Sequence, residues 1–76
     1  MTEAQIVGKN VKEQRLKSGM KQWEVARILA VSLTAYKEIE LGSEDITIYK
    51  IPELAKIFRV EPCVLYKGLT VVGWIN

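Results

Sequence analysis

The sequence has no histidine and only one cysteine, Cys63, among its 76 residues. Without histidine a His-based catalytic triad is excluded, and one cysteine cannot form an internal disulfide or complete the usual ligand set of a zinc site. No apolar run approaches the roughly 18 residues that a membrane-spanning helix needs. Residues 1–9 also lack the cationic and then apolar order of a secretory signal. We therefore expect a cytoplasmic protein that is not an enzyme, with no metal, cofactor, small-molecule ligand or membrane partner.

The chain has little net charge, but its charges are unevenly distributed. Its composition, 49% hydrophobic and 26% charged, is that of one small globular domain. The formal net charge of +2 divides into +3 for residues 1–31, −3 for residues 32–48 and +2 for residues 49–76. Because proteins that bind nucleic acid concentrate positive charge where they contact phosphate, the acidic middle segment bears directly on such a function.

Apolar periodicity and helix-end signals predict five short helices. In chain order they run from the capping box Thr2-Glu3-Ala4-Gln5 to Ser18-Gly19, over Gln22–Leu29, from the N-cap Ser32 over Leu33–Leu41 to Gly42, from the N-cap Thr47 to Phe58, and from Glu61-Pro62 through Tyr66 to Gly68. Lys21 offers no capping oxygen to the second helix, which costs it about 1 kcal/mol relative to a serine. Pro52 requires either an irregular first turn in the fourth helix or a regular start near Ile51. The side chains expected in the core are Val7, Val11, Leu16, Val25, Ala26, Leu29, Val31, Tyr36, Ile39, Ile51, Leu54, Ala55, Phe58 and Cys63.

The second and third helices, joined by the three-residue turn at residues 30–32, form a helix-turn-helix. The run from Gly19 to Gly42 resembles the Cro and phage-repressor family of DNA-binding domains. The positions that fit the family pattern are Gln22, Val25, Ala26, Leu29, Val31, Ser32, Tyr36, Ile39, Glu40 and Gly42. With the downstream helices the resemblance covers about residues 6–68. It implies an all-α, five-helix lambda-repressor-like DNA-binding domain over residues 1–68. Residues 69–76, which are β-branched and aromatic, are predicted to form a C-terminal hydrophobic arm or strand.

The resemblance also implies an ion pair between Arg15 of the first helix and Glu40 near the end of the third. A buried pair of this kind adds little net stability but costs roughly 3–5 kcal/mol to break. The alternative is that both residues are solvated surface charges.

The DNA contacts follow from the same resemblance. The predicted DNA-binding residues are Lys21, Gln22, Leu33, Thr34, Lys37, Glu38 and Ser43. Gln22 is placed to contact a phosphate at the positive end of the second helix, unless it is only an ordinary polar residue of a first turn. At the start of the third helix, Leu33 suits a thymine methyl and Thr34 a base edge or a phosphate. Lys37 suits guanine or phosphate, and Glu38 suits cytosine N4. This face has no Arg, Asn or Gln to read a base through two hydrogen bonds, which weakens direct discrimination.

Two features depart from the family pattern. Ser43, Glu44 and Asp45 stand where family members usually carry Lys or Arg. Either the carboxylates turn away and lysines supply the phosphate contacts in their place, or the domain has shifted to binding a basic protein. The lysines that would then supply the phosphate contacts are Lys9, Lys12, Lys21 and Lys37. Trp23 replaces an exposed polar residue, and it is either an anchor for a partner, stacked over a neighbouring cation, or partly buried against a loop.

The sequence thus predicts a sequence-specific transcription regulator, a repressor from a phage or other mobile element, which binds double-stranded DNA at a palindromic operator as a homodimer. The alternative is a protein-interaction module of the same fold, such as an anti-regulator or an antitoxin, with weakened DNA binding. We expect the dimer contact in a ribbon of two arms, or else on helix five, although the arm could instead fold back over its own chain. The predicted interface residues are Val64, Leu65, Val71, Val72, Trp74 and Ile75.

Overall fold

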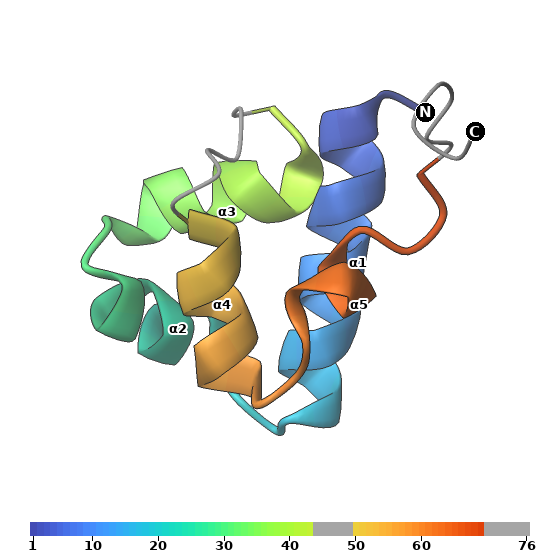
Figure 1. Ribbon diagram of the computed structural model, residues 1–76. Coiled ribbons are helices and arrows are strands. Elements are labelled where there is room, and N and C mark those ends of the chain that lie inside the picture. Colours follow the sequence, from blue (N-terminus) through green and yellow to red (C-terminus); the bar gives the residue numbers. More distant parts are fainter. Residues whose placement is uncertain (44–49, 70–76) are drawn as a thin grey trace.

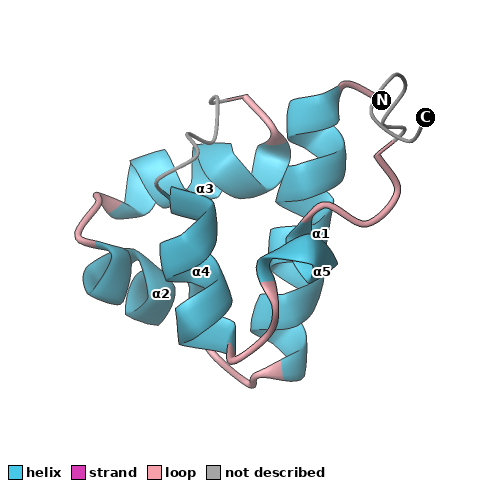
Figure 2. Ribbon diagram, in the orientation of Figure 1, coloured by secondary structure: helices cyan, strands magenta, loops and turns pink. Residues whose placement is uncertain are grey.

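Five helices make up the part of the chain that the computed structural model describes, residues 1–43 and 50–69 (Figure 1). They are α1 (Glu3–Lys17), α2 (Gln22–Leu29), α3 (Leu33–Leu41), α4 (Lys50–Phe58) and α5 (Pro62–Leu65). Figure 2 shows helices and connecting loops, and no strand, in these described residues. The predicted all-α, five-helix fold is therefore confirmed. The predicted Thr47 cap and residues 70–76 of the predicted arm lie outside the described residues.

The predicted ends of α1 and α3 are confirmed by their caps. The Thr2 hydroxyl accepts a hydrogen bond from the Gln5 backbone N–H at 3.1 Å, and Gln5 Oε1 accepts from the Thr2 backbone N–H at 2.9 Å. Ser32 Oγ accepts from the Ala35 backbone N–H at 3.1 Å at the start of α3. Gly42 ends α3 with a left-handed φ of 76°, a conformation that glycine adopts without a steric penalty.

The ends of α2 are less favourable than those of its neighbours. At the N-terminus, Glu24 Oε1 accepts from the Lys21 backbone N–H at 2.8 Å, but the lysine has no side-chain acceptor to complete a capping box. At the C-terminus, Ala30 is left-handed with φ 62° and ψ 42°, which costs an L-residue about 1–2 kcal/mol. This conformation ends α2 sharply and lets α3 begin at Leu33.

The last two helices follow the predicted positions with small differences. Pro52 is the third residue of α4 as described, within the first turn, where the N–H that proline lacks would have no partner in the helix. α5 ends at Leu65, and Tyr66, predicted as its last residue, forms the cap with φ −99°.

One hydrophobic core joins the helices. Its buried members are Val7, Val11, Val25, Ala26, Leu29, Tyr36, Ile39, Ile51, Leu54, Ala55, Phe58 and Leu65. Two core predictions are wrong, because Leu16 is 59% exposed and Cys63 is exposed. Leu16 lies nine residues after Val7, which at 100° per residue places it on the opposite side of α1. The single turn of α5 directs Leu65 inward, so Cys63 two residues earlier faces outward.

The burial of Leu65 also corrects the predicted dimer interface. Leu65 is 0% exposed within its own chain, so its side chain has no surface to offer a second copy. Val64 is half-buried and keeps some exposed surface. The other predicted interface residues, Val71, Val72, Trp74 and Ile75, lie outside the described residues.

α1 supports α3 through very close backbone contact. A Cβ atom added to Gly8 would clash with the Ile39 carbonyl oxygen and lie 2.8 Å from that of Glu40. A Cβ on Gly42 would lie 2.5 Å from Gln5 Cα. The N-terminal half of α1 therefore crosses the C-terminal end of α3 with only glycine between them, and Figure 1 shows these two segments side by side.

Candidate nucleic-acid interface

A single carboxylate, Glu40, ties the helix-turn-helix to α1. Glu40 Oε2 accepts a hydrogen bond from Arg15 Nε at 2.6 Å and another from the Tyr36 hydroxyl, while Oε1 accepts from Arg15 Nη2 at 3.2 Å. Gln22 Nε2 of α2 also donates to Oε1, at 3.0 Å. Arg15 Nη1 donates in turn to the Met20 carbonyl oxygen at 3.0 Å. The Arg15 and Glu40 side chains are 10% and 4% exposed, so the pair is buried and not a solvated surface contact.

Each member of this cluster is held in one protonation state. Burial acts to raise the pKa of Glu40, but the hydrogen bonds from Arg15, Tyr36 and Gln22 outweigh it and keep that pKa below its usual range. Burial and the hydrogen bond to Glu40 raise the pKa of Tyr36 far above that of a free phenol. The hydrogen bond to Glu40 raises the pKa of Arg15. Near neutral pH the cluster therefore consists of a carboxylate, a guanidinium and a neutral phenol that donates a hydrogen bond. Among the described residues, no buried polar side-chain atom is left without a hydrogen-bond partner.

The outer face of α3 carries the predicted reading residues. Leu33 is 40% exposed, and Thr34 and Lys37 are exposed, whereas Glu38 is only half-exposed. The opposite face of α3 is pinned by Tyr36 and Ile39 in the core and by Glu40 in the polar cluster. The structure thus brings Leu33, Thr34 and Lys37 together on a surface whose backbone is fixed from behind. Such rigid support is what a side chain needs to read a base edge with precision.

The remaining predicted DNA contacts are less uniform. Lys21 and Ser43 are exposed, at the start of α2 and just after α3. The Gln22 side chain, in contrast, is half-buried and donates to Glu40. The structure therefore gives this amide an internal role that the predicted phosphate contact did not include. Glu44 and Asp45, the two acidic residues that depart from the family pattern, lie outside the described residues.

Sequence reasoning missed three polar roles. The Tyr36 hydroxyl was treated only as part of an apolar seam, although its spacing of four residues from Glu40 on one helix was a usable signal. The bond from Gln22 to Glu40 joins positions 18 residues apart, and no local pattern reports it. Asn10 Nδ2 donates to the Leu65 and Lys67 carbonyl oxygens at 2.9 and 2.7 Å, and this holds α5 against α1.

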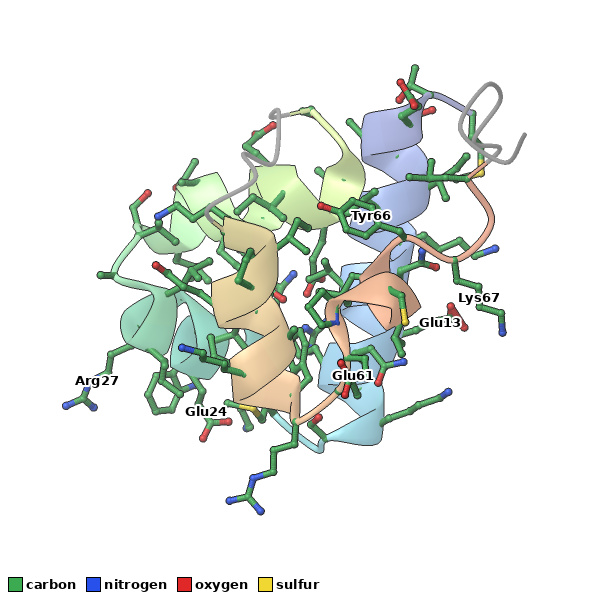
Figure 3. All side chains as sticks on the ribbon, viewed as in Figure 1. Glu13, Glu24, Arg27, Glu61, Tyr66 and Lys67 are labelled. Carbon is green, nitrogen blue, oxygen red and sulfur yellow. The ribbon has the colours of Figure 1, made fainter. Side chains whose placement is uncertain are left out.

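The outward face of α2 carries both apolar and charged side chains. Trp23 is 52% exposed and Ile28 is 60% exposed, so Trp23 is not sequestered in the core. Glu24 and Arg27 border the same surface, and Figure 3 shows both pointing away from the helix bundle. This face lies on α2, apart from the reading residues of α3.

No described helix combines the length and the apolar character that crossing a membrane requires. No cluster of three or more cysteine, aspartate or glutamate side chains placed to hold a metal ion occurs in residues 1–43 or 50–69.

Comparison with known proteins agrees with this geometry. The sequence profile of the Cro/C1-type helix-turn-helix family matches residues 11–65. The chain belongs to this family, and it is a DNA-binding protein of the kind that regulates transcription.

One solved structure with the same fold is the restriction-modification controller protein C.AhdI from Aeromonas hydrophila. The two chains superpose with a TM-score of 0.76 at 22% sequence identity, over 82% of this chain and 94% of the controller protein. At that level of identity the likeness shows a shared fold. No curated protein sequence matches the chain.

Proposed function

We propose that this protein is a transcriptional repressor that binds a palindromic operator as a homodimer, with residues 1–68 as the DNA-binding domain. The observation that carries the proposal is the exposed start of α3, at Leu33, Thr34 and Lys37, fixed from behind by the buried cluster around Glu40. An α-helix fits the major groove of B-DNA, where each base pair presents a distinct set of donors, acceptors and methyl groups. The similarity to a controller protein supports a regulatory role.

The contacts proposed for the reading surface are those of the sequence prediction. Leu33 packs on a thymine methyl, and Thr34 and Lys37 donate to base edges or phosphates. Lys21, just before α2, and Ser43, just after α3, contact the DNA backbone. Gln22 positions the start of α2 through Glu40 and presents its backbone N–H toward phosphate. Glu38 accepts from cytosine N4.

Two substitutions test these contacts. Thr34→Ala and Lys37→Ala are each expected to weaken binding to the preferred sequence by roughly 1–3 kcal/mol while leaving the melting temperature unchanged. Both side chains are exposed, so their removal opens no cavity. Arg59→Ala, on an exposed residue beyond α4, is a matched control that should bind like the parent chain. Full affinity in both α3 variants would remove α3 from the DNA interface.

The operator and the regulatory role require separate measurements. Selection of bound sequences from random duplex DNA should enrich two inverted half-sites spaced about one helical turn apart, because a twofold dimer presents two copies of α3. A reporter whose promoter overlaps that sequence should lose transcription when the protein is present. Enrichment of a single unpaired half-site would contradict the dimer, and a rise in transcription would contradict repression.

The dimer contact is proposed in the C-terminal arm, residues 69–76, on the strength of its apolar composition. Truncation after Gly68 should convert a dimer to a monomer in sedimentation at micromolar concentration. If the full chain is already monomeric, the arm does not dimerise the protein. If the truncated chain remains dimeric, the interface lies elsewhere, and α5 is the next candidate because Val64 is only half-buried there.

A second candidate is a protein-interaction module of the same fold, and the exposed Trp23 and Ile28 on α2 favour it. In that case the apolar face of α2 would be the binding surface and the start of α3 would be unused. Retention on random duplex DNA at low salt, lost as salt rises, separates the two functions, because only the DNA-binding protein releases counterions from phosphate.

A further inference from the structure

A pair of lysines borders the C-terminal end of the reading helix. Gln5, Lys9 and Lys12 follow one another at spacings of four and three residues, so they form a stripe along one side of α1. A shallow groove is lined by this stripe and by Glu40 and Leu41 at the end of α3. Because Gly8 and Gly42 allow the two helices to touch, the lysines stand immediately beside α3.

The groove has an uncompensated positive charge. Its lining consists of Met1, Gln5, Lys9, Lys12, Glu40 and Leu41. Glu40 is the one carboxylate in this lining, and its charge is already matched by Arg15 in the buried pair. Lys9 and Lys12 are exposed, so their charges are available to an outside anion.

One side of α3 extends from the reading residues to the groove beside α1. Leu33, Lys37 and Leu41 lie four residues apart on the outer side of α3. The nine residues of α3 span about 14 Å, close to the roughly 12 Å width of the major groove. When Leu33 and Lys37 face base edges, the Leu41 end of α3 therefore lies near the wall of the major groove of DNA, where the phosphates are.

The start of α2 also contacts Glu40. Gln22 bonds to Glu40 from α2, whereas Lys9 and Lys12 border it from α1. Lys21 is exposed next to Gln22. Lys21 before α2 and the two lysines of α1 thus lie on or next to elements that contact Glu40, near the end of α3, where a passing phosphate backbone would need positive charge.

We propose that Lys9 and Lys12 of α1 form a phosphate-binding track for the DNA strand that passes the C-terminal end of α3. This track adds positive charge to a domain in which the sequence segment 32–48 has a net charge of −3. It rests on the proposed DNA-binding function and adds to it a second site of contact, which recognises the backbone and no base.

The test compares the salt dependence of binding in the full chain. The probe is a duplex of random sequence, titrated between about 50 and 200 mM salt. Each phosphate contact contributes about 0.9 to the slope of log K against log salt. Lys9→Gln with Lys12→Gln should therefore reduce that slope by about 1.8, and should weaken binding at the lowest salt by roughly tenfold for each lysine.

Two control variants separate a local contact from overall charge. Lys17→Gln with Lys67→Gln removes the same charge from two exposed residues, one at the end of α1 and one just after α5. Their side chains line a different groove. It should change the slope by less than about half a unit. Lys9→Arg with Lys12→Arg should keep the parent slope, and all variants should melt at the parent temperature, because these side chains are exposed.

The outcomes distinguish this inference from the function on which it rests. An unchanged slope in the Lys9 and Lys12 variant, with the parent chain binding well, overturns the track and leaves the DNA-binding function intact. An equal loss in the Lys17 and Lys67 variant also overturns it, because the effect would then be one of net charge. Failure of the parent chain to bind the random duplex at low salt overturns the DNA-binding function itself.

Discussion

Breaking the buried pair between Arg15 and Glu40 should be one of the most damaging single changes in this chain. Glu40→Leu would leave the Arg15 side chain, which is only 10% exposed, without its carboxylate, and would also remove the acceptor for Tyr36 and Gln22. Stranding a buried charge in this way costs about 3–5 kcal/mol. A domain of this length has a total stability of about 4–11 kcal/mol. The variant should therefore melt at least about 12 °C below the parent chain, and its urea midpoint should fall as well.

A double-mutant cycle isolates the pair from its surroundings. Arg15→Met and Glu40→Leu should each be strongly destabilising, but the double variant should lose about 2–3 kcal/mol less than the sum, because neither charge is then left alone. Urea unfolding followed by circular dichroism measures all four free energies of unfolding. Single losses below about 1 kcal/mol that add in the double variant would match an exposed pair and refute the reasoning.

Three further predictions concern the acid titration of Glu40, the hydrogen bonds of Asn10 and the left-handed end of α2. Because the pKa of Glu40 is lowered on folding, its charge stabilises the protein fully above pH of about 4.5 and less as pH falls through the lowered value; the stability gap between the parent chain and Glu40→Gln should shrink over that range in acid titrations of unfolding. Asn10→Ala should cost about 2–3 kcal/mol in urea unfolding, since it leaves the Leu65 and Lys67 carbonyl oxygens without their donor, and a loss under about 0.5 kcal/mol would show that water replaces the amide. Ala30→Gly should stabilise the chain by about 0.5–1 kcal/mol, because glycine accepts the left-handed conformation at the end of α2, and a lower melting temperature would contradict this.

The helices could be predicted from the sequence because the signals at their ends depend on neighbouring residues. The Thr2 capping box, the Ser32 N-cap and the Gly42 stop each depend on residues within one turn, and the structure contains all three. The inward residues of α2 and α3 repeat at helical spacing, so Val25 and Ile39 were also assigned correctly to the core.

The errors have two causes, the facing of residues on a helix for Leu16 and Cys63, and contact with distant parts of the chain for Leu65. Leu16 is apolar but lies on the side of α1 away from the core, and Cys63 loses its place to Leu65 in a single turn of helix. Leu65 was wrongly assigned to a dimer interface. Its burial depends on the packing of α5 against α1 and α4, which the local sequence does not reveal.

The candidate site was predicted unevenly, because part of it depends on contacts between distant parts of the chain. The exposed positions Thr34 and Lys37 follow from helical periodicity and the family resemblance. The hydrogen bond that turns Gln22 toward Glu40 follows only from the crossing of α2 and α3, which no local pattern encodes. The DNA contacts themselves stay predictions until binding is measured.

The measurement that tests the central claim most directly is the ratio of two affinities of the full chain at one salt concentration. One ligand is the duplex enriched by selection, and the other is the same duplex with its bases scrambled. A regulator that reads sequence through α3 should bind the selected duplex at least about a thousandfold more tightly. Equal affinities for the two duplexes, or no binding to either at low salt, would contradict the account.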